Sequence, residues 1–174
     1  MELGEMLIRT KGYHAFSYQD ISGPLAIHNA AVHYYFPAKA DLGAAIIDRS
    51  MAQFGELTTR WNHLPAEEQF KLFTQIYLAS RQQGWVCLMG ALSPGYDTLP
   101  GSMQAKLRQM GEEILDWLTG CLQKGKAAGV FGFGEPTRQK AQLIVSCLLS
   151  SLLLGKVMGE TLFQSIQEGV QGSV

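Results

Sequence analysis

The sequence predicts an all-α fold of about nine helices. Apolar residues recur at spacings of three and four through most of the 174 residues, which is the period of an amphipathic helix. No run of alternating β-branched residues followed by a hairpin turn indicates a strand. Two breaks rich in glycine and proline, at residues 93–101 and 129–137, separate long helical segments.

The chain is predicted to begin with a short amphipathic helix over residues 3–11. Gly12 follows this segment and can adopt the left-handed backbone conformation on which helices commonly end. The residues that repeat on its apolar side are Leu3, Met6, Leu7 and Thr10.

A second short helix is predicted to start after Ser17, which is a suitable N-cap residue. Asp20 stands three residues later, in the position of a capping-box acid. We expect Ile21 and Leu25, four residues apart, to be the buried pair of this helix. A tight turn at residues 26–27 follows it.

The remaining three quarters of the chain predict longer helices. They are expected at residues 39–61, from Pro65 onward, at residues 103–129, at residues 136–159 and at residues 161–170. The segment 136–159 is the most apolar, but serines interrupt it. It therefore indicates a buried helix and not a membrane span.

Composition and charge exclude several classes of protein. At 47% hydrophobic and 17% charged residues, the chain is typical of a packed globule and not of a disordered protein. The net charge is -1, and the first fifty residues carry four basic against five acidic side chains, so charge alone does not indicate a polyanionic partner. No signal peptide opens the chain, and we expect a cytoplasmic protein without a membrane partner.

Metal binding and catalysis are not indicated. Cys87, Cys121 and Cys147 are far apart and form no Cys-x-x-Cys pair, so reduced thiols are expected. No two histidines have the spacing of metal ligands. Glycine-rich phosphate loops and nucleophile-elbow motifs are missing as well. We therefore expect no metal, no cofactor and no enzymatic activity.

The segment HNAAVHYYFPAKADL, residues 28–42, predicts a third short helix that begins at its first or second residue and ends before Pro37. On a wheel of about 100° per residue, Val32 and Phe36 fall together as a buried pair. Tyr35 lies beside them and is expected to belong to the core. This side of the helix would seat it on the rest of the protein.

The opposite side of this helix consists of Ala30 and Tyr34, flanked by Ala31 and His33. Two short helices joined by a tight turn, the second starting with small and polar residues, form a helix-turn-helix. Small residues let the backbone approach base edges, alanine methyls can meet a thymine methyl, and Asn29 can read an adenine. The side chains suited to phosphate contacts are His28, His33, Tyr34 and Lys39. The alternative is a plain three-helix corner.

Residues 3–50 resemble the N-terminal DNA-binding domain of the TetR family of bacterial transcriptional regulators. The matching segments are LIRTKGYHAFSYQDIS and LAIHNAAVHYYFPAKADL, with the long helix that follows. An aromatic-rich end of the recognition helix, then Phe, a short stop and Lys, is the most recognisable part of the family pattern, and VHYYFPAKADL is similar to it. The remainder resembles the family in length, helical content and order of helices.

The resemblance implies a DNA-binding domain at residues 1–47 and an effector-binding and dimerisation domain at residues 48–174. It implies a homodimeric transcriptional regulator of a palindromic double-stranded operator, most often a repressor released by a small-molecule effector or by thiol modification. In that frame the second helix touches phosphate, and residues 28–31 read bases. The residues assigned to DNA binding are Ser17, Tyr18, His28, Asn29, Ala30, Ala31, His33, Tyr34 and Lys39.

Some residues depart from the family pattern. Gly23 and Pro24 interrupt the second helix, where proline typically costs about 3 kcal/mol. Ala26 stands in place of the usual turn glycine. With the weak positive charge, these departures leave open an alternative function, a helical ligand-binding or interaction protein that has lost DNA binding.

The resemblance also draws attention to Cys87, because a subgroup of TetR-like regulators carries in this segment a cysteine that responds to electrophiles or oxidants. Lys106 and Arg108 are cations of the kind that lower a thiol pKa. The alternative for Cys87 is a small buried apolar residue. Cys121 and Cys147 lie in apolar helical patterns and are expected in the core.

The long helices predict two further kinds of site. Their aromatic and apolar residues can line an effector pocket or fill the core. The pocket candidates are Trp61, Phe73, Tyr77, Cys87, Met89, Met110 and Trp117. The segment 136–159, too apolar for an exposed helix, is expected to form a two-fold four-helix interface with residues 161–170. The interface candidates are Leu143, Cys147, Ser150, Ser151, Leu154 and Phe163.

Overall fold

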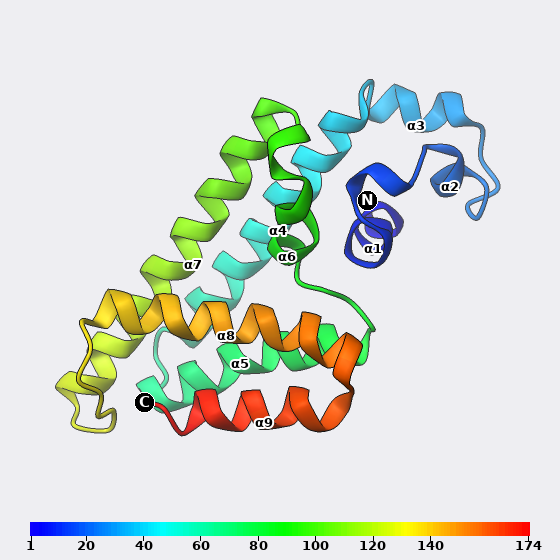
Figure 1. The fold of residues 1–174 in the computed structure, drawn as a ribbon. Helices are drawn as coiled ribbons and strands as arrows, with labels where there is room; N and C mark the ends of the chain where they lie inside the picture. Colours follow the sequence, from blue (N-terminus) through cyan, green and yellow to red (C-terminus); the bar gives the residue numbers. More distant parts are fainter. The chain divides into compact units, whose positions relative to one another are not determined.

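The computed structural model describes all residues 1–174 and consists of helices without any strand (Figure 1). The α-helices are α1 (Glu2–Lys11), α2 (Gln19–Ser22), α3 (Asn29–Tyr35), α4 (Lys39–Trp61), α5 (Ala66–Gln82), α6 (Leu88–Leu92), α7 (Gly101–Ala127), α8 (Thr137–Met158) and α9 (Glu160–Gln171). Two short 3-10 helices, η1 (Tyr13–Ala15) and η2 (Ser93–Thr98), lie between them. The all-α fold class is confirmed.

The chain forms two compact units. The first contains residues 1–53 and 88–110, and the second contains residues 54–87 and 111–174. The long helices α4 and α7 each contribute residues to both units. These units are defined by packing, so the functional boundary expected after residue 47 stays a prediction.

Proline and glycine set the ends of the long helices, as predicted. Pro65 and Pro136 are the residues before the first turns of α5 and α8, where a missing backbone N–H costs nothing. Gly159 ends α8 with a φ of 95°, a backbone conformation that other residues rarely adopt, and α9 starts directly after it. The short helix α6 has no counterpart in the sequence prediction.

The core of the second unit is formed by α5, α7, α8 and α9. Helices α8 and α9 run antiparallel, side by side (Figure 1). A Cβ on Gly155 of α8 would lie 2.9 Å from the Cβ of Phe163 on α9, so this glycine permits the close approach of the two helices. Phe163 is fully buried in the resulting core.

The first unit holds an ion-pair cluster that joins α1 to α4. Glu5 is buried and accepts from Arg9, at 2.7 Å, and from Arg49 of α4. The preceding residue, Gly4, lets α1 approach α4 closely, since a Cβ there would lie 3.3 Å from side-chain atoms of Leu42 and Ile46. A buried carboxylate shared by two guanidinium groups fixes the register between these helices.

The second short helix is shorter than predicted. It ends at Ser22, because the chain enters a turn at Gly23–Pro24 and proline cannot continue the hydrogen-bond ladder. Ile21 is buried as expected, but Leu25 lies in the turn and is 54% exposed. The prediction that these two residues form a buried pair is therefore wrong.

One helix, α8, is long and apolar enough to span a membrane by length and composition alone. A single such helix is weak evidence, because core helices of soluble proteins pass the same criteria. One side of α8, with Ile144, Leu148 and Leu152, is buried in the second unit. That burial gives the apolar residues of this side a packing role.

Replacement of Phe163 by alanine tests the packing of α8 against α9. Because the ring is fully buried, we expect the Phe163→Ala variant to lose about 3–5 kcal/mol in free energy of unfolding, measured by urea denaturation. The matched control is Gln164→Ala, which alters an exposed neighbour on α9 and should change the value by less than about 0.5 kcal/mol. Equal values for the two variants would contradict this packing.

Candidate nucleic-acid interface

The helix-turn-helix consists of α2, the turn at residues 23–28 and α3. Within the turn, the backbone N–H of Ala26 donates to the carbonyl of Gly23, and that of Ile27 donates to Ser22, both at 3.1 Å. Ala26 has a φ of 53°, in the left-handed region that glycine prefers, which costs about 1 kcal/mol for alanine. Ala26 thus adopts a backbone conformation that alanine disfavours.

Helix α3 is anchored on one side and bare on the other. Val32 is its only buried residue, and Phe36, which follows the helix, is half-buried. Ala30 is exposed, and Tyr34 is 81% exposed. A helix that inserts into a groove needs such a bare face, although the DNA contacts of its residues stay predictions.

Tyr35 lies on the bare side of the helix, not in the core. It is 74% exposed, and its ring contacts that of Tyr34 edge-on, with 5.2 Å between centroids. The prediction that Tyr35 is a core residue is therefore wrong. The reason is that α3 is short and ends at Tyr35, so that Val32 alone is buried from this helix.

Tyr18 has a structural role that the sequence did not indicate. Its side chain is buried, and its hydroxyl donates to the carbonyl of Phe36 at 2.7 Å, which ties the start of α2 to the end of α3. Its ring packs edge-on against His33, with 4.6 Å between centroids. Burial raises the pKa of the Tyr18 hydroxyl. The phosphate contact of Tyr18 stays a prediction, and in this structure its hydroxyl proton is engaged by the carbonyl of Phe36.

Ser17 is exposed, but its donors are directed at a carboxylate. The backbone N–H and the hydroxyl of Ser17 donate to Oδ2 of Asp20, at 2.7 and 2.8 Å. These bonds lower the pKa of Asp20, the backbone bond being the largest cause. The ionised carboxylate therefore occupies the place beside Ser17 where a phosphate contact was predicted, and the two anions would repel each other.

Two other predicted DNA contacts already have partners within the chain. Asn29 accepts from the hydroxyl of Ser22, so its amide NH₂ group is the part left to donate. The ammonium of Lys39 donates to the carbonyl of Phe16 and lies over the rings of Phe16 and Tyr13, 4.1 and 4.8 Å from their centroids. Burial lowers the pKa of Lys39. Its other two N–H groups remain for a phosphate.

The interface carries little fixed positive charge. Residues 12–38 contain no lysine or arginine, and Asp20 is their one acid. Three histidines, His14, His28 and His33, are their only side chains that can become cationic, and all three are exposed. The non-specific, salt-dependent part of DNA affinity should therefore be small.

Several residues of the predicted effector pocket lie in the core of the second unit, which was the alternative left open for them, and the pocket itself stays a prediction. Trp61, Phe73 and Tyr77 are buried, and Trp117 contacts Phe73 with ring centroids 5.4 Å apart. Burial also raises the pKa of Tyr77. Met89 and Met110 belong to the first unit, so the predicted set is not gathered at one site.

Cys87 is half-buried, and the two cations proposed to activate it are engaged elsewhere. Lys106 pairs with Asp48 at 2.6 Å, and Arg108 donates to the hydroxyl of Tyr96 at 3.1 Å, both within the first unit. Cys87 belongs to the second unit. The role of Cys87 as a sensor stays a prediction, and Lys106 and Arg108 do not support it.

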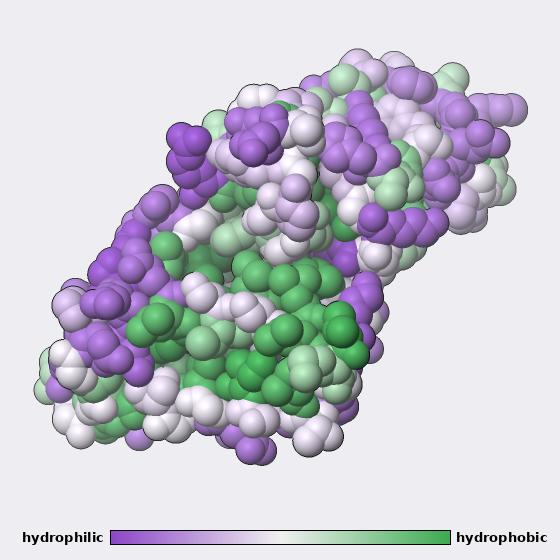
Figure 2. Space-filling view, in the orientation of Figure 1, coloured by the Kyte–Doolittle hydropathy of each residue, from purple (hydrophilic) through white to green (hydrophobic).

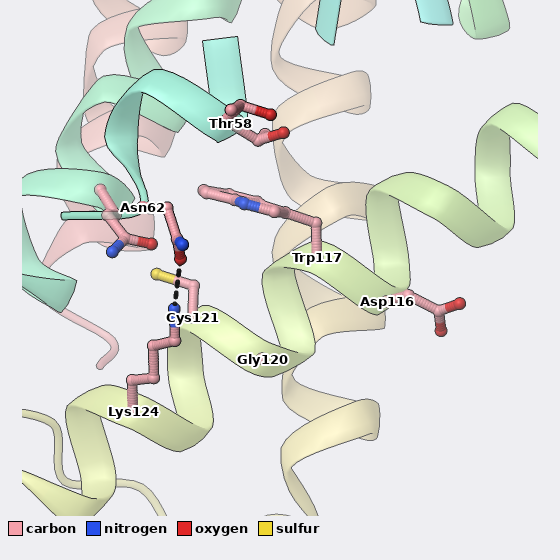
Figure 3. A pocket seen from close by; sticks show the side chains of 9 residues that line it. Thr58, Asn62, Asp116, Trp117, Gly120, Cys121 and Lys124 are labelled. Carbon is pink, nitrogen blue, oxygen red and sulfur yellow. Dashed lines mark hydrogen bonds between the residues drawn. The ribbon is translucent and has the colours of Figure 1, made fainter. Parts of the chain in front are cut away.

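An open groove in the second unit was missed by the sequence analysis (Figure 3). It has a volume of about 340 Å³ and lies between the end of α4, the start of α5 and the C-terminal half of α7. The lining residues are Thr58, Thr59, Asn62, Gln69, Asp116, Trp117, Gly120, Cys121 and Lys124. Only Trp117 belongs to the predicted pocket. No motif signals the others, because more than fifty residues separate the α4 and α7 contributions.

The outer side of α8 is an apolar stripe (Figure 2). Leu143 and Leu154 are 48% and 42% exposed, Cys147 is exposed, and Ser150 is half-buried. The exposure of Cys147 contradicts its assignment to the core. Ser151 and Phe163, however, are fully buried within the chain. These two residues pack inside the second unit and cannot present themselves to a partner, so their assignment to an interface is corrected.

The hydrogen bonds around Asp20 predict a pH dependence of stability. Its pKa is lowered from the ordinary 3.8, so the ionised carboxylate stabilises the fold above that pH, and the stabilisation is lost as the pH falls through the lower folded value. We expect Asp20→Ala to lower the thermal midpoint near neutral pH and the difference from the parent to disappear in acid. Gln19→Ala, at the exposed neighbour, is the control. A difference that persisted undiminished in acid would contradict the assignment.

No protein-family model matches the chain, and no curated protein matches it either. Solved structures, in contrast, resemble it over almost its whole length. A TetR transcriptional regulator from Legionella pneumophila shares 27% sequence identity at a TM-score of 0.89, over 99% of this chain and 94% of that chain. A TetR-family regulator from Agrobacterium tumefaciens shares 23% identity at a TM-score of 0.92, with the same coverage of 99% and 94%.

A third similar structure is the transcriptional regulator FadR from Bacillus subtilis in complex with stearoyl-CoA, at 18% identity and a TM-score of 0.72, over 99% of this chain and 96% of that chain. Since each match covers 99% of this chain, it includes the helix-turn-helix at the N-terminus and the long helices after it. The chain therefore has the all-α fold of the TetR family of transcriptional regulators, a fold that supports a DNA-binding regulator.

Proposed function

We propose that the chain is a homodimeric transcriptional repressor that binds a palindromic operator and is released from it by a small-molecule effector. The observation that carries this proposal is the one-sided seating of α3, with Val32 in the core and Ala30 and Tyr34 bare. A core helix is covered on both sides, so a seven-residue helix with a bare aromatic face indicates a binding surface.

Bases are contacted by the first turn of α3 and phosphates by its end. Ala30 and the NH₂ group of Asn29 face the base edges, where a methyl group and a donor can discriminate between base pairs. His28, His33 and Tyr34 donate to the backbone. Tyr35 joins them as an exposed donor that the sequence analysis had placed in the core.

The apolar stripe of α8 supports the proposed dimerisation. Leu143, Cys147, Ser150, Leu154 and Val157 recur at spacings of three and four on its outer side, as in the seam of a helix bundle. Val157 is 84% exposed, which is unfavourable for a valine in water. A second copy packed on this stripe removes it from water and supplies the second recognition helix that a palindrome requires, one helical turn or about 34 Å away.

Release requires an effector that binds two conformations of the dimer unequally. Helices α4 and α7 contribute to both compact units, so a change in the second unit has a continuous helical route into the first. FadR, which has a similar fold, is described in complex with stearoyl-CoA. By analogy, a small organic molecule is the effector class we assign to this chain, acting in the cytoplasm where the operator lies.

One observation favours a second function. Without lysine or arginine in residues 12–38, the chain gains little from counterion release on DNA. A ligand-binding protein that has lost DNA binding would show dimerisation and ligand uptake but no operator complex. Binding assays in low salt with the promoter region of the chain's own gene separate the two functions.

The exposed ring of Tyr34 provides a direct test of DNA binding. We expect Tyr34→Ala to weaken operator binding about tenfold in fluorescence anisotropy, because a groove or phosphate contact is lost. Thermal stability should not change, since the ring is 81% exposed. Tyr34→Phe, which removes only the hydroxyl, separates a phosphate hydrogen bond from ring packing. If parent and Tyr34→Ala bind promoter DNA equally, or neither binds at low salt, the repressor proposal fails.

The α8 stripe provides a test of dimerisation. We expect Leu154→Glu to produce monomers in light scattering after size-exclusion chromatography, because two-fold symmetry brings two unpaired carboxylates into an apolar interface. Leu78→Glu is the matched control, since Leu78 is 40% exposed on α5, outside the stripe. A dimer that survives Leu154→Glu as well as Leu78→Glu places the interface elsewhere.

A further inference from the structure

The groove between α4, α5 and α7 combines a flat aromatic wall with polar groups at its rim. Figure 3 shows the indole of Trp117 extending between Thr58 on one side and Cys121 on the other. The ring is held edge-on by Phe54 and Trp61, with centroids 5.7 and 5.8 Å away. A ring fixed in this way gives a ligand a preformed surface for stacking.

The positive charge of Lys124 has no acidic partner. Its ammonium donates to Oδ1 of Asn62 at 3.0 Å, a neutral acceptor, and forms no ion pair. The acid of the groove, Asp116, pairs with Arg138 of α8, which also pairs with Glu112. Figure 3 shows the Asp116 carboxylate pointing away from Asn62 and Lys124. The Lys124 end of the groove therefore presents a cation that pairs with no acid, which favours an anionic ligand group there.

The threonines face the groove as acceptors. The hydroxyls of Thr58 and Thr59 both donate to the carbonyl of Gly55, at 3.1 and 2.8 Å, so their protons are engaged and their lone pairs remain. A ligand therefore gains from a donor group at the α4 side of the groove. Burial raises the pKa of the Cys121 thiol to about 11, and the thiol donates toward the carbonyl of Ala66 at 3.5 Å. This thiol lines the groove and is not a nucleophile.

We propose that this groove binds a small aromatic carboxylate that carries a hydroxyl or N–H donor on its ring. The carboxylate pairs with Lys124 and the NH₂ group of Asn62, the ring stacks on Trp117, and the donor bonds a threonine hydroxyl. The volume of about 340 Å³ lies at the small end of the range for ligand sites, as such a molecule requires. That this ligand is the effector rests on the proposed function, whereas its binding does not.

The experiment uses three probes on the full chain in isothermal titration calorimetry: 4-hydroxybenzoate, 4-hydroxybenzamide and benzoate. The amide lacks the negative charge, and benzoate lacks the donor. We expect saturable binding of 4-hydroxybenzoate, with a Kd on the order of 1 mM or below, and weaker binding of the other two. If 4-hydroxybenzoate shows no saturable binding, or if the amide binds as tightly as the acid, the proposal is overturned.

Substitutions locate the site. Lys124→Gln keeps a donor to Asn62 but removes the charge, and we expect it to weaken 4-hydroxybenzoate binding about fivefold while leaving the amide unchanged. We expect Thr58→Val to lower the affinity for 4-hydroxybenzoate toward that for benzoate. Lys71→Gln, an exposed cation of α5 outside the groove, is the matched control. Equal affinities in Lys124→Gln and Lys71→Gln would place the ligand at another site.

A separate readout distinguishes this proposal from the proposed function. Operator binding by the chain without any probe tests the repressor, and calorimetry without DNA tests the groove. When both assays show binding, 4-hydroxybenzoate should weaken operator binding by the parent and by Lys71→Gln. The Lys124→Gln variant should need a higher concentration of the probe for the same effect. If calorimetry succeeds and operator binding is unaffected by the probe, the groove binds a ligand but the assignment of this ligand as effector fails.

Discussion

The candidate interface depends on how a short helix is held from one side. Helix α3 has seven residues, too few to be stable alone in water. Val32 packs into the core, and the hydroxyl of Tyr18 binds the carbonyl of Phe36 just after the helix. The side of α3 with Ala30 and Tyr34 is exposed. Ser22, which donates to Asn29, fixes the first turn.

The same arrangement leaves few groups that can bind phosphate. Ser17 donates its backbone N–H and its hydroxyl to Asp20 of α2, and the ammonium of Lys39 lies over the rings of Phe16 and Tyr13. The interface therefore offers a ligand mainly its shape and its amide and hydroxyl donor groups. Such a surface would bind through specific contacts more than through charge.

The second unit has a tightly packed centre and an open groove at its edge. The rings of Phe54, Phe73 and Trp117 contact one another, so the space between the long helices is filled. The indole of Trp117 nevertheless borders the groove. One residue thus belongs to the core and to the wall of the groove, because a large aromatic side chain is rarely covered on every side.

The sequence by itself determined the fold class, the long helices and most of their ends, since the helical period and the positions of proline and glycine are local properties. It also indicated that Val32 is buried and that Ala30 is bare, because these residues differ in hydrophobicity and lie on opposite sides of one helix. Those inferences need only neighbours along the chain.

Tertiary structure decided the rest. Packing between helices decides the burial of Tyr18, the exposure of Tyr35 and the hydrogen bond of Lys39 to Phe16. No local sequence pattern contains that information. The groove is a stronger case, since Asn62 and Lys124 come together only when α4 packs beside α7. Packing brings side chains that are distant in the sequence into one site, and packing is a property of the whole folded chain.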